Sequence, residues 1–316
     1  MNEIVLAGDL GGTNLRMAAV ASDGRLLYRT EIRTPQTERA EKIVEAVVKL
    51  ASECLQTSDR ENSAKSLSLA VPAVINSAEG QIVHSPNLPA LNGFELSAAI
   101  ASELNLPVTL ENDATAAALG ENWRGASKGF DSSICVTLGT GVGGGIIING
   151  IPLRGIDGTA GEIGHICVEP LGVECGCGSS GCLEQYSSAS AISRMAYELR
   201  DKYPASLIKS EGGMVLPLDV FDAGKSDDAL ALEVFRRVGF YLGLALAGLV
   251  NVLNPEVIVI CGGAAAGWDL FIEHVRAEIR KRAFQGPAER ARIIRGVLGD
   301  DAGILGAAWL AFEKMD

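Results

Sequence analysis

The chain lacks several features that would assign it to a common class of protein. It has no block of basic residues, and its 39 acidic against 27 basic side chains give a formal net charge of −12. Because such a chain repels a phosphate backbone on average, we expect no nucleic acid among its partners. Its longest largely apolar stretch, Phe240–Val252, is shorter than the roughly 20 residues that cross a bilayer, so we expect no membrane partner either.

Targeting and linker signals are also missing. The first residues, MNEIVLAGDL, lack the basic start and the long apolar run of a secretory signal peptide, and no low-complexity segment interrupts the chain. A hydrophobic content of 47% with 37 glycines is typical of a globular α/β protein. The sequence therefore predicts a cytoplasmic protein, and its 316 residues allow two domains with well-filled cores.

The motif G-x-x-x-x-G-K-[ST] is absent as well, which excludes a P-loop nucleotide site. Instead, glycine-rich turns stand between pairs of expected strands: LGGTN between Ile4–Asp9 and Leu15–Ala21, and GTGVGGG between Ile134–Leu138 and Ile146–Asn149. Plain hairpin turns are the alternative, but a third glycine turn follows the expected strand VIVIC. Backbone N–H groups at such turns can converge on anionic oxygens. We predict phosphate contacts from Gly11, Gly12, Thr13, Thr140, Gly141, Gly262 and Gly263.

Asp9 ends the first expected strand, beside the first of these turns. A carboxylate there is suited to hold Mg²⁺ through water, because Mg²⁺ takes oxygen ligands and usually keeps several waters. The sequence therefore predicts a magnesium-assisted phosphate site around Asp9.

Apolar spacing predicts the other elements. The expected helices are residues 37–53, 94–104, 114–123, 190–202, 228–251, 268–282 and 302–314, and the further strands are 25–30, SLSLAVP and 108–111. A weak echo between VLAGDLGGTNLRMAAV and ICVTLGTGVGGGIIIN indicates two related α/β domains.

Four of the seven cysteines and one of the three histidines lie between Glu162 and Gln185, and three of these cysteines fall within 175–182. One imidazole and three thiolates form a common ligand set of closed tetrahedral zinc sites, and four protein ligands leave no position for a reactive water. The alternatives are a disulfide with a spare thiol, which is disfavoured because cytosolic thiols stay reduced, and free thiols in a loop. The predicted structural zinc ligands are His165, Cys175, Cys177 and Cys182. The other cysteines are expected in the core: Cys54, Cys135, Cys167 and Cys261.

The segment EIGH at 162–165, followed by CGCGSSGCLE at 175–184, resembles the E-x-G-H and C-x-C-G-x-x-G-C-x-E signature of the ROK family of sugar kinases, repressors and open reading frames. DLGGTN, SPNLP, LENDA, LGTGVGGG and CGGA follow in the family's order along nearly the whole chain. Within the family, the chain is most similar to bacterial glucokinases. It departs from many relatives in AVPA at 70–73, where they have G-x-P-G, and at Leu91, where glucokinases often carry tryptophan.

The resemblance implies an α/β protein with the actin-like ATPase (ribonuclease H-like) fold, in which ATP lies in a cleft between two domains. Residues 1–113 and 301–316 would form a smaller domain, and residues 114–300 a larger domain with the zinc loop. The third glycine turn would border the nucleoside.

The resemblance also implies that Asp113 is the catalytic base, although an aspartate between VTLE and ATAAAL equally suits a helix N-cap. The vicinal hydroxyls of a sugar need carboxylate and amide partners, and the zinc loop would hold two glutamates in place. An Asx turn is the alternative role for Asn87. The implied sugar-binding set is Asn87, Asn112, Asp113, Glu162, His165 and Glu184.

The expected activity is the ATP-dependent phosphorylation of a hexose to its 6-phosphate, D-glucose before others, with Mg²⁺ and a structural Zn²⁺. N-acetylglucosamine, N-acetylmannosamine, fructose and mannose are alternative substrates. A ROK repressor is the non-enzyme alternative, disfavoured because the first hairpin begins at Ile4 and leaves no room for a helix-turn-helix domain before it. The family further implies a homodimer or a homotetramer.

Overall fold

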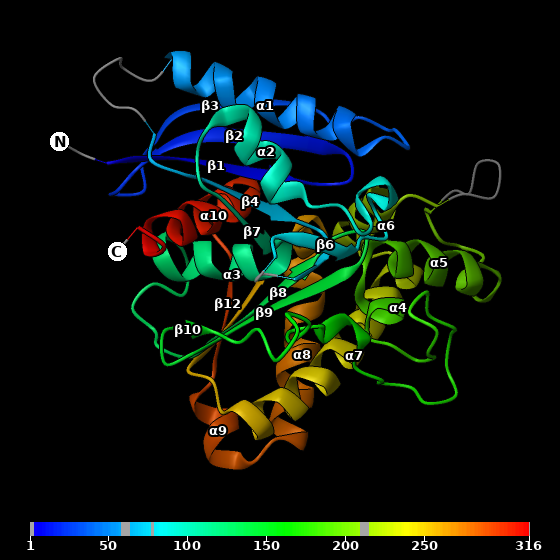
Figure 1. Cartoon of the computed structure of the whole chain (residues 1–316). Coiled ribbons are helices and arrows are strands. Elements are labelled where there is room, and N and C mark those ends of the chain that lie inside the picture. Colours follow the sequence, from blue (N-terminus) through cyan, green and yellow to red (C-terminus); the bar gives the residue numbers. More distant parts are fainter. Residues whose placement is uncertain (1–2, 58–63, 77–78, 209–214, 316) are drawn as a thin grey trace. The chain divides into compact units, whose positions relative to one another are not determined.

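The computed structural model describes residues 3–57, 64–76, 79–208 and 215–315. The chain groups into two compact units (Figure 1). The first comprises Met1–Asp131, Gly145–Gly161 and Val297–Asp316, and the second comprises Ser132–Gly144 and Glu162–Gly296.

A five-stranded sheet with the order β3-β2-β1-β4-β7 forms the centre of the first unit (Figure 1). Neighbours among β1, β2 and β3 are antiparallel, whereas β1, β4 and β7 run parallel. The register pairs Asp9 with Ala70 and Ala70 with Glu111, so Asp9 and the end of β7 lie at the same edge of the sheet. The strands are β1 (Ile4–Leu10), β2 (Asn14–Ala21), β3 (Leu26–Arg33), β4 (Leu67–Val71) and β7 (Val108–Asn112).

Successive side chains of β1 face opposite cores, as alternation along a strand buried on both sides requires. Ile4 and Leu6 belong to a core built with helices α1 (Ala40–Thr57) and α2 (Leu96–Leu104). Val5 and Ala7 belong to a second core with helix α10 (Ala302–Glu313). The sheet is thus covered on both faces.

Helix α3 (Asp113–Arg124) begins directly after β7 and packs against α10. The two backbones approach so closely that a Cβ on Gly306 would overlap the carbonyl oxygen of Ala116. A Cβ on Gly303, one turn earlier in α10, would lie 3.3 Å from Cγ of Asp9. Helix α10 therefore sets the spacing between the helix that carries Asp113 and the strand that carries Asp9.

The second sheet has the order β10-β9-β8-β11-β12. Strands β8, β11 and β12 are parallel neighbours. The division between the units falls within β9, between Gly144 and Gly145. The strands are β8 (Ser133–Leu138), β9 (Val142–Ile148), β10 (Ile151–Pro152), β11 (Val257–Cys261) and β12 (Arg292–Arg295).

The helices of the second unit are dominated by the pair α7 and α8, which pack along each other (Figure 1). A Cβ on Gly243 of α7 would lie 2.9 Å from the carbonyl oxygen of Val275, so this glycine allows the close approach. Among the described residues, no helix has both the length and the hydropathy of a membrane span. The helices are α4 (Glu184–Ser187), α5 (Ala189–Leu199), α6 (Pro217–Lys225), α7 (Ala229–Leu253), α8 (Trp268–Arg282) and α9 (Gln285–Arg290).

Every predicted helix and strand is present in the predicted order, with ends that differ by a few residues, but several short elements were not predicted, among them β10, β12, α4, α6 and α9. The predicted helix 268–282 has the bounds of α8. The predicted domain boundary at Asp113 differs from the observed grouping, because α3 stays with the first unit through its packing on α10. Residues 145–161 also group with the first unit. A short hairpin of β5 (Val74–Asn76) and β6 (Gln81–His84) completes that unit.

Candidate functional site

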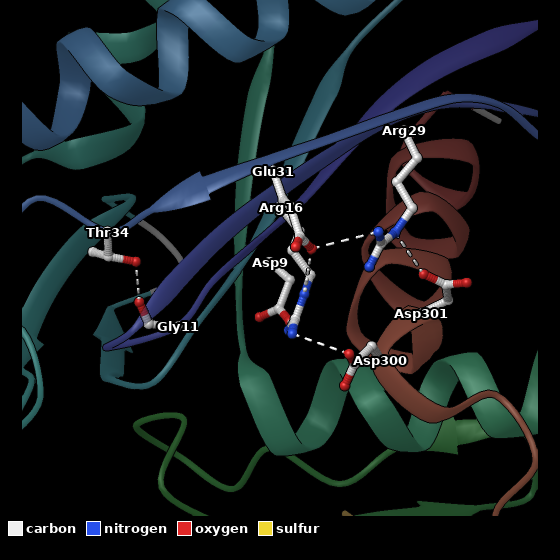
Figure 2. Close-up of polar contacts among 8 residues, drawn as sticks. All are labelled: Asp9, Gly11, Arg16, Arg29, Glu31, Thr34, Asp300 and Asp301. Atoms are coloured by element: carbon white, nitrogen blue, oxygen red, sulfur yellow. Dashed lines mark hydrogen bonds and ion pairs between the residues drawn. The ribbon is translucent and has the colours of Figure 1, made fainter.

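The first glycine turn, between β1 and β2, is braced by the segment that follows β3. Thr34, which is 3% exposed, donates its hydroxyl to the Gly11 carbonyl at 2.6 Å (Figure 2). Its N–H donates to the Thr13 carbonyl at 2.9 Å, and the Gln36 side chain donates to the Gly12 carbonyl at 2.9 Å. Because all three carbonyls are engaged, the turn is held in one conformation, as an anion-binding turn requires.

Asp9 lies at the carboxyl end of β1 and faces Arg16 of β2. Arg16 Nη1 is 3.4 Å from Asp9 Oδ2, and Arg16 Nη2 is 3.1 Å from Asp300 Oδ2 (Figure 2). Burial raises the pKa of Asp9, and the guanidinium of Arg16 offsets this only in part. The ionised carboxylate is therefore held in an unfavourable environment, which a bound cation would relieve.

The ion-pair network around Asp9 extends along the sheet edge. Arg16 Nε is 3.4 Å from Glu31 Oε2, and Arg29 lies 3.4 Å from the same oxygen and 2.9 Å from Asp301 Oδ1 (Figure 2). With the two aspartates above, four carboxylates share two guanidiniums. The resulting formal charge of −2 suits a divalent cation.

The junction of β7 and α3 carries two candidate sugar-binding residues. Asn112 is the N-cap of α3: its Oδ1 accepts N–H bonds from Ala114 at 3.0 Å and Thr115 at 3.1 Å. Asp113 is therefore the first helical residue, and the N-cap role considered for it belongs to Asn112. Asp113 Oδ1 accepts from the Ala114 N–H at 2.9 Å, and Asn112 Nδ2 donates to the Ala73 carbonyl at 3.3 Å.

Asn87 lies against the first glycine turn. A Cβ on Gly12 would be 3.2 Å from Cβ of Asn87, so the predicted sugar-binding and phosphate-binding residues meet here. The loop around Asn87 is anchored by the fully buried Ser85, whose hydroxyl donates to the Pro72 carbonyl at 2.8 Å and accepts from the Leu88 N–H at 3.2 Å. Asn87 itself is exposed, as a ligand contact requires.

The second glycine turn, residues 139–144, is tied to the segment after the cysteine cluster. Glu184 Oε2 accepts from the Val142 N–H at 3.0 Å, and a Cβ on Gly141 would overlap this oxygen. Ser190 donates to the Thr140 carbonyl at 2.9 Å. Glu184 therefore already contacts the turn, so a role in sugar binding and a role in holding the turn can be combined.

The third glycine turn stands directly after β11. Gly262 has φ of 89°, and a Cβ there would lie 2.5 Å from the Leu138 carbonyl oxygen at the end of β8. Only glycine meets both requirements without strain. The second and third turns are thus neighbours within the second unit.

The four predicted zinc ligands converge, with their ligand atoms all within 4.8 Å of one another. Sγ of Cys177 and Sγ of Cys182 are 3.7 Å apart, and Sγ of Cys175 is 3.6 Å from Nδ1 of His165. A tetrahedral zinc with bonds of about 2.3 Å to sulfur and about 2.05 Å to nitrogen places such pairs about 3.8 Å and about 3.6 Å apart. The donor set and its spacing therefore fit zinc.

Glu162 and the second glycine turn both lie next to the cluster of His165 and three cysteines. His165 Nδ1 faces the thiols, while its Nε2 lies 3.9 Å from Glu162 Oε2, on the side where a metal-bound imidazole would have its N–H. A Cβ on Gly164 would overlap the Val142 carbonyl oxygen, so the cluster also abuts the second glycine turn. Among the remaining cysteines, Cys167 is exposed, contrary to the expected core position, and Cys54, Cys135 and Cys261 are buried.

The predicted site residues are distributed over both units. The first unit contains Asp9, Gly11, Gly12, Thr13, Asn87, Asn112 and Asp113. The second contains Thr140, Gly141, Glu162, His165, Cys175, Cys177, Cys182, Glu184, Gly262 and Gly263. Within each unit, candidate sugar ligands contact a candidate phosphate turn.

Several supporting residues were not predicted. Arg16 had a detectable signal, since it stands directly opposite Asp9 in the expected hairpin and carries the opposite charge. Thr34, Gln36 and Ser85 had none, because each acts on a backbone carbonyl or N–H that no sequence pattern identifies.

Comparison with known proteins gives matches along almost the entire chain. The model of the ROK family matches residues 5–314. A glucokinase from Halalkalibacterium halodurans is 38% identical over 311 residues, which cover 97% of this chain and 94% of that protein. A ROK family glucokinase from Streptomyces griseus, solved in complex with glucose and AMPPNP, has a TM-score of 0.82 with 31% identity over 98% of this chain and 99% of that chain.

A ROK family transcriptional regulator, described as a homologue of the E. coli MLC protein, has a TM-score of 0.86 with 27% identity and is matched over 99% of this chain and 78% of that chain. These neighbours have the actin-like ATPase fold of ROK proteins, which confirms the predicted fold class. The length of the family match and the identity to the glucokinase lead to one conclusion: the chain belongs to the ROK family.

Proposed function

We propose that the chain transfers the γ-phosphoryl group of ATP to the 6-hydroxyl of a hexose, with D-glucose as the preferred acceptor. The observation that carries the proposal is the near full-length similarity to glucokinases, one of which was solved with glucose and an ATP analogue. The two glycine turns that contact candidate sugar ligands, Asn87 and Glu184, support it independently.

Asp113 is the proposed base. A sugar hydroxyl with a pKa near 16 and a carboxylate near 4 are mismatched by about 12 units, or about 16 kcal/mol, so full deprotonation before attack is excluded. Asp113 instead orients the hydroxyl and accepts its proton late, as a loose phosphoryl transfer lowers the charge on the attacking oxygen. Positioning is then the main contribution, and the rigid start of α3 supplies it.

The proposed sugar contacts include the amide of Asn112 and the carboxylates of Asp113, Glu162 and Glu184. Asn112 Oδ1 already accepts two backbone N–H groups, so Asn112 contributes as a donor through Nδ2. Asp113 and Glu162 offer acceptors for vicinal hydroxyls, and the same is proposed for Glu184. Ala73, whose carbonyl holds Asn112, stands where many relatives have glycine, and we propose that it shapes the selectivity of this wall.

Asp9 is the proposed Mg²⁺ residue, acting through water, and Gly11, Gly12, Thr13, Thr140, Gly141, Gly262 and Gly263 are the proposed nucleotide contacts. When bound with ATP, Mg²⁺ neutralises charge on the phosphates. The structural zinc would be held by His165, Cys175, Cys177 and Cys182 and would fix the loop between Glu162 and Glu184. Arg16, whose Nη1 lies 3.4 Å from Asp9 Oδ2, would help to orient this carboxylate.

A coupled assay with ATP against glucose, mannose, fructose, N-acetylglucosamine and N-acetylmannosamine tests the proposal. We expect the highest kcat/KM with glucose. A higher value with another of these sugars would change the assigned substrate. Binding of a sugar without turnover of any would instead support a sugar-sensing role, which the similarity to the regulator makes the second candidate.

A further inference from the structure

Glu111, the last residue but one of β7, is a buried carboxylate with both oxygens engaged. Its side chain is 7% exposed. Oε2 accepts two bonds from Arg154, at 2.9 Å from Nε and 2.7 Å from Nη2, and Oε1 accepts from the N–H of Asn112 at 3.1 Å. Two guanidinium donors on Oε2 and a backbone N–H on Oε1 together fix the carboxylate in orientation as well as in position.

Arg154 reaches Glu111 from a loop that is distant in sequence but belongs to the same unit. The loop closes on itself, since the Ala160 N–H donates to the Arg154 carbonyl at 3.1 Å, and the Leu153 N–H donates to the Ile146 carbonyl at 2.8 Å. A Cβ on Gly158 would lie 2.8 Å from the Ile75 carbonyl, so the loop also rests on β5. Arg154 is therefore presented by a braced segment.

We propose that the Arg154–Glu111 pair positions Asn112 and Asp113 for the sugar. Glu111 holds the N–H of Asn112, and the next two side chains are the helix cap and the proposed base. The pair thus determines how the chain leaves β7 and enters α3. This inference rests on the proposed function, in which Asp113 contacts the reacting hydroxyl.

A contribution to stability alone does not account for the pair. A buried ion pair loses hydration on both partners, and apolar residues of similar size often replace such a pair without loss of stability. What apolar side chains cannot replace is the hydrogen bond that the Asn112 N–H donates to Oε1 of Glu111. Arg154 and Glu111 are accordingly positioning residues, which act through Asn112 and Asp113.

The experiment compares two variants. Arg154→Met leaves the carboxylate of Glu111 without its guanidinium partner, whereas the double variant Glu111→Met/Arg154→Met removes both charges. We expect kcat per folded molecule to fall about 100-fold in both, as a displacement of about 1 Å at a reacting group can cause. Arg154→Lys should recover only part of this loss, because a lysine ammonium cannot reproduce the planar pair of Nε and Nη2 donors that Arg154 directs at Oε2. Activity is measured well below the unfolding temperature of each variant.

Arg282→Met is the matched control. Arg282 Nε is 2.6 Å from Glu278 Oε2, and their side chains are 35% and 15% exposed, against 32% and 7% for Arg154 and Glu111. The control should lose stability and keep its kcat. A native kcat in the double variant overturns the positioning role, as does an equal kcat loss in the control.

Asp113→Asn distinguishes a failure of the proposed function from a failure of the positioning role. If Asp113→Asn retains turnover, the proposed base is wrong, whatever Arg154→Met does. If Asp113→Asn is inactive but the double variant is fully active, the proposed function stands and the positioning role fails.

Discussion

A single methyl group at Gly306 tests whether α10 sets the position of the helix that begins at Asp113. In Gly306→Ala the new Cβ would overlap the Ala116 carbonyl oxygen, a backbone atom that no side-chain rotation can move. Overpacking of this kind costs up to about 3 kcal/mol, and the better helix propensity of alanine returns about 1 kcal/mol. The remaining loss of about 2 kcal/mol corresponds to a fall in Tm of roughly 4–8 °C.

The same displacement should reach the chemistry. Since α3 must move away from α10, Asp113 shifts relative to Asp9, and a shift of about 1 Å can reduce kcat about 100-fold. Differential scanning fluorimetry and the coupled assay measure both effects on one sample.

Gly248→Ala is the matched control for this substitution. Gly248 lies inside α7 with no atom within 4 Å of the position of its Cβ, so the same change should raise Tm slightly and leave kcat unchanged. If Gly306→Ala has the Tm and kcat of the wild type, α10 does not set the position of α3.

Three further predictions concern the metal cluster and two titrating carboxylates. Cys177→Ser should contain no bound zinc when measured by elemental analysis, and it should have a lower Tm and a lower sugar affinity. Cys167→Ser changes an exposed thiol outside the cluster and should keep the metal. Full metal content in Cys177→Ser would refute the site. Burial raises the folded-state pKa of Asp9, so the ionised Asp9 carboxylate destabilises the folded protein at a pH above the usual pKa of aspartate. Asp9→Asn should therefore be inactive, with a Tm at neutral pH equal to or above that of the wild type and no such difference in acid. A lower Tm at neutral pH would contradict this. Hydrogen bonds from Arg236 and Arg237 lower the pKa of Glu233 to about 2. The ionised Glu233 therefore stabilises the folded protein fully above about pH 4.5, and this contribution is lost as the pH falls toward 2. Glu233→Gln should therefore be less stable at neutral pH by about 1 kcal/mol, allowing for the exposure of both arginines, and a loss that persists at pH 2 would exclude this cause.

Local patterns predicted most of the fold. The glycine turns after Asp9 and Leu138, the buried strand VIVIC and the amphipathic helix 268–282 each follow from residues adjacent in sequence, and all appear as expected. The extent of the first unit did not follow from such patterns. It depends on the glycine contact of α3 with α10, between residues nearly two hundred positions apart.

The sequence also predicted some features of the candidate site and missed others. The cluster of His165, Cys175, Cys177 and Cys182 was predictable because thiolates and imidazole at that spacing have few other uses, and the structure brings the four side chains together. The cap of α3 was not, since Asn112 and Asp113 are both favourable N-cap residues and only the backbone decides between them. Arg154 was equally hidden, because its contact with Glu111 joins two segments with no shared motif.

The central proposal is that Asp113, the first residue of α3, directs a sugar hydroxyl to the γ-phosphate of ATP. Phosphorus NMR of a reaction with glucose and ATP tests it most directly, with wild-type protein and Asp113→Asn examined in parallel. The account predicts glucose 6-phosphate from the wild type, and a rate lower by several powers of ten in the variant with glucose binding retained by calorimetry. Near-normal product formation by Asp113→Asn, or no sugar phosphate from the wild type, would contradict it.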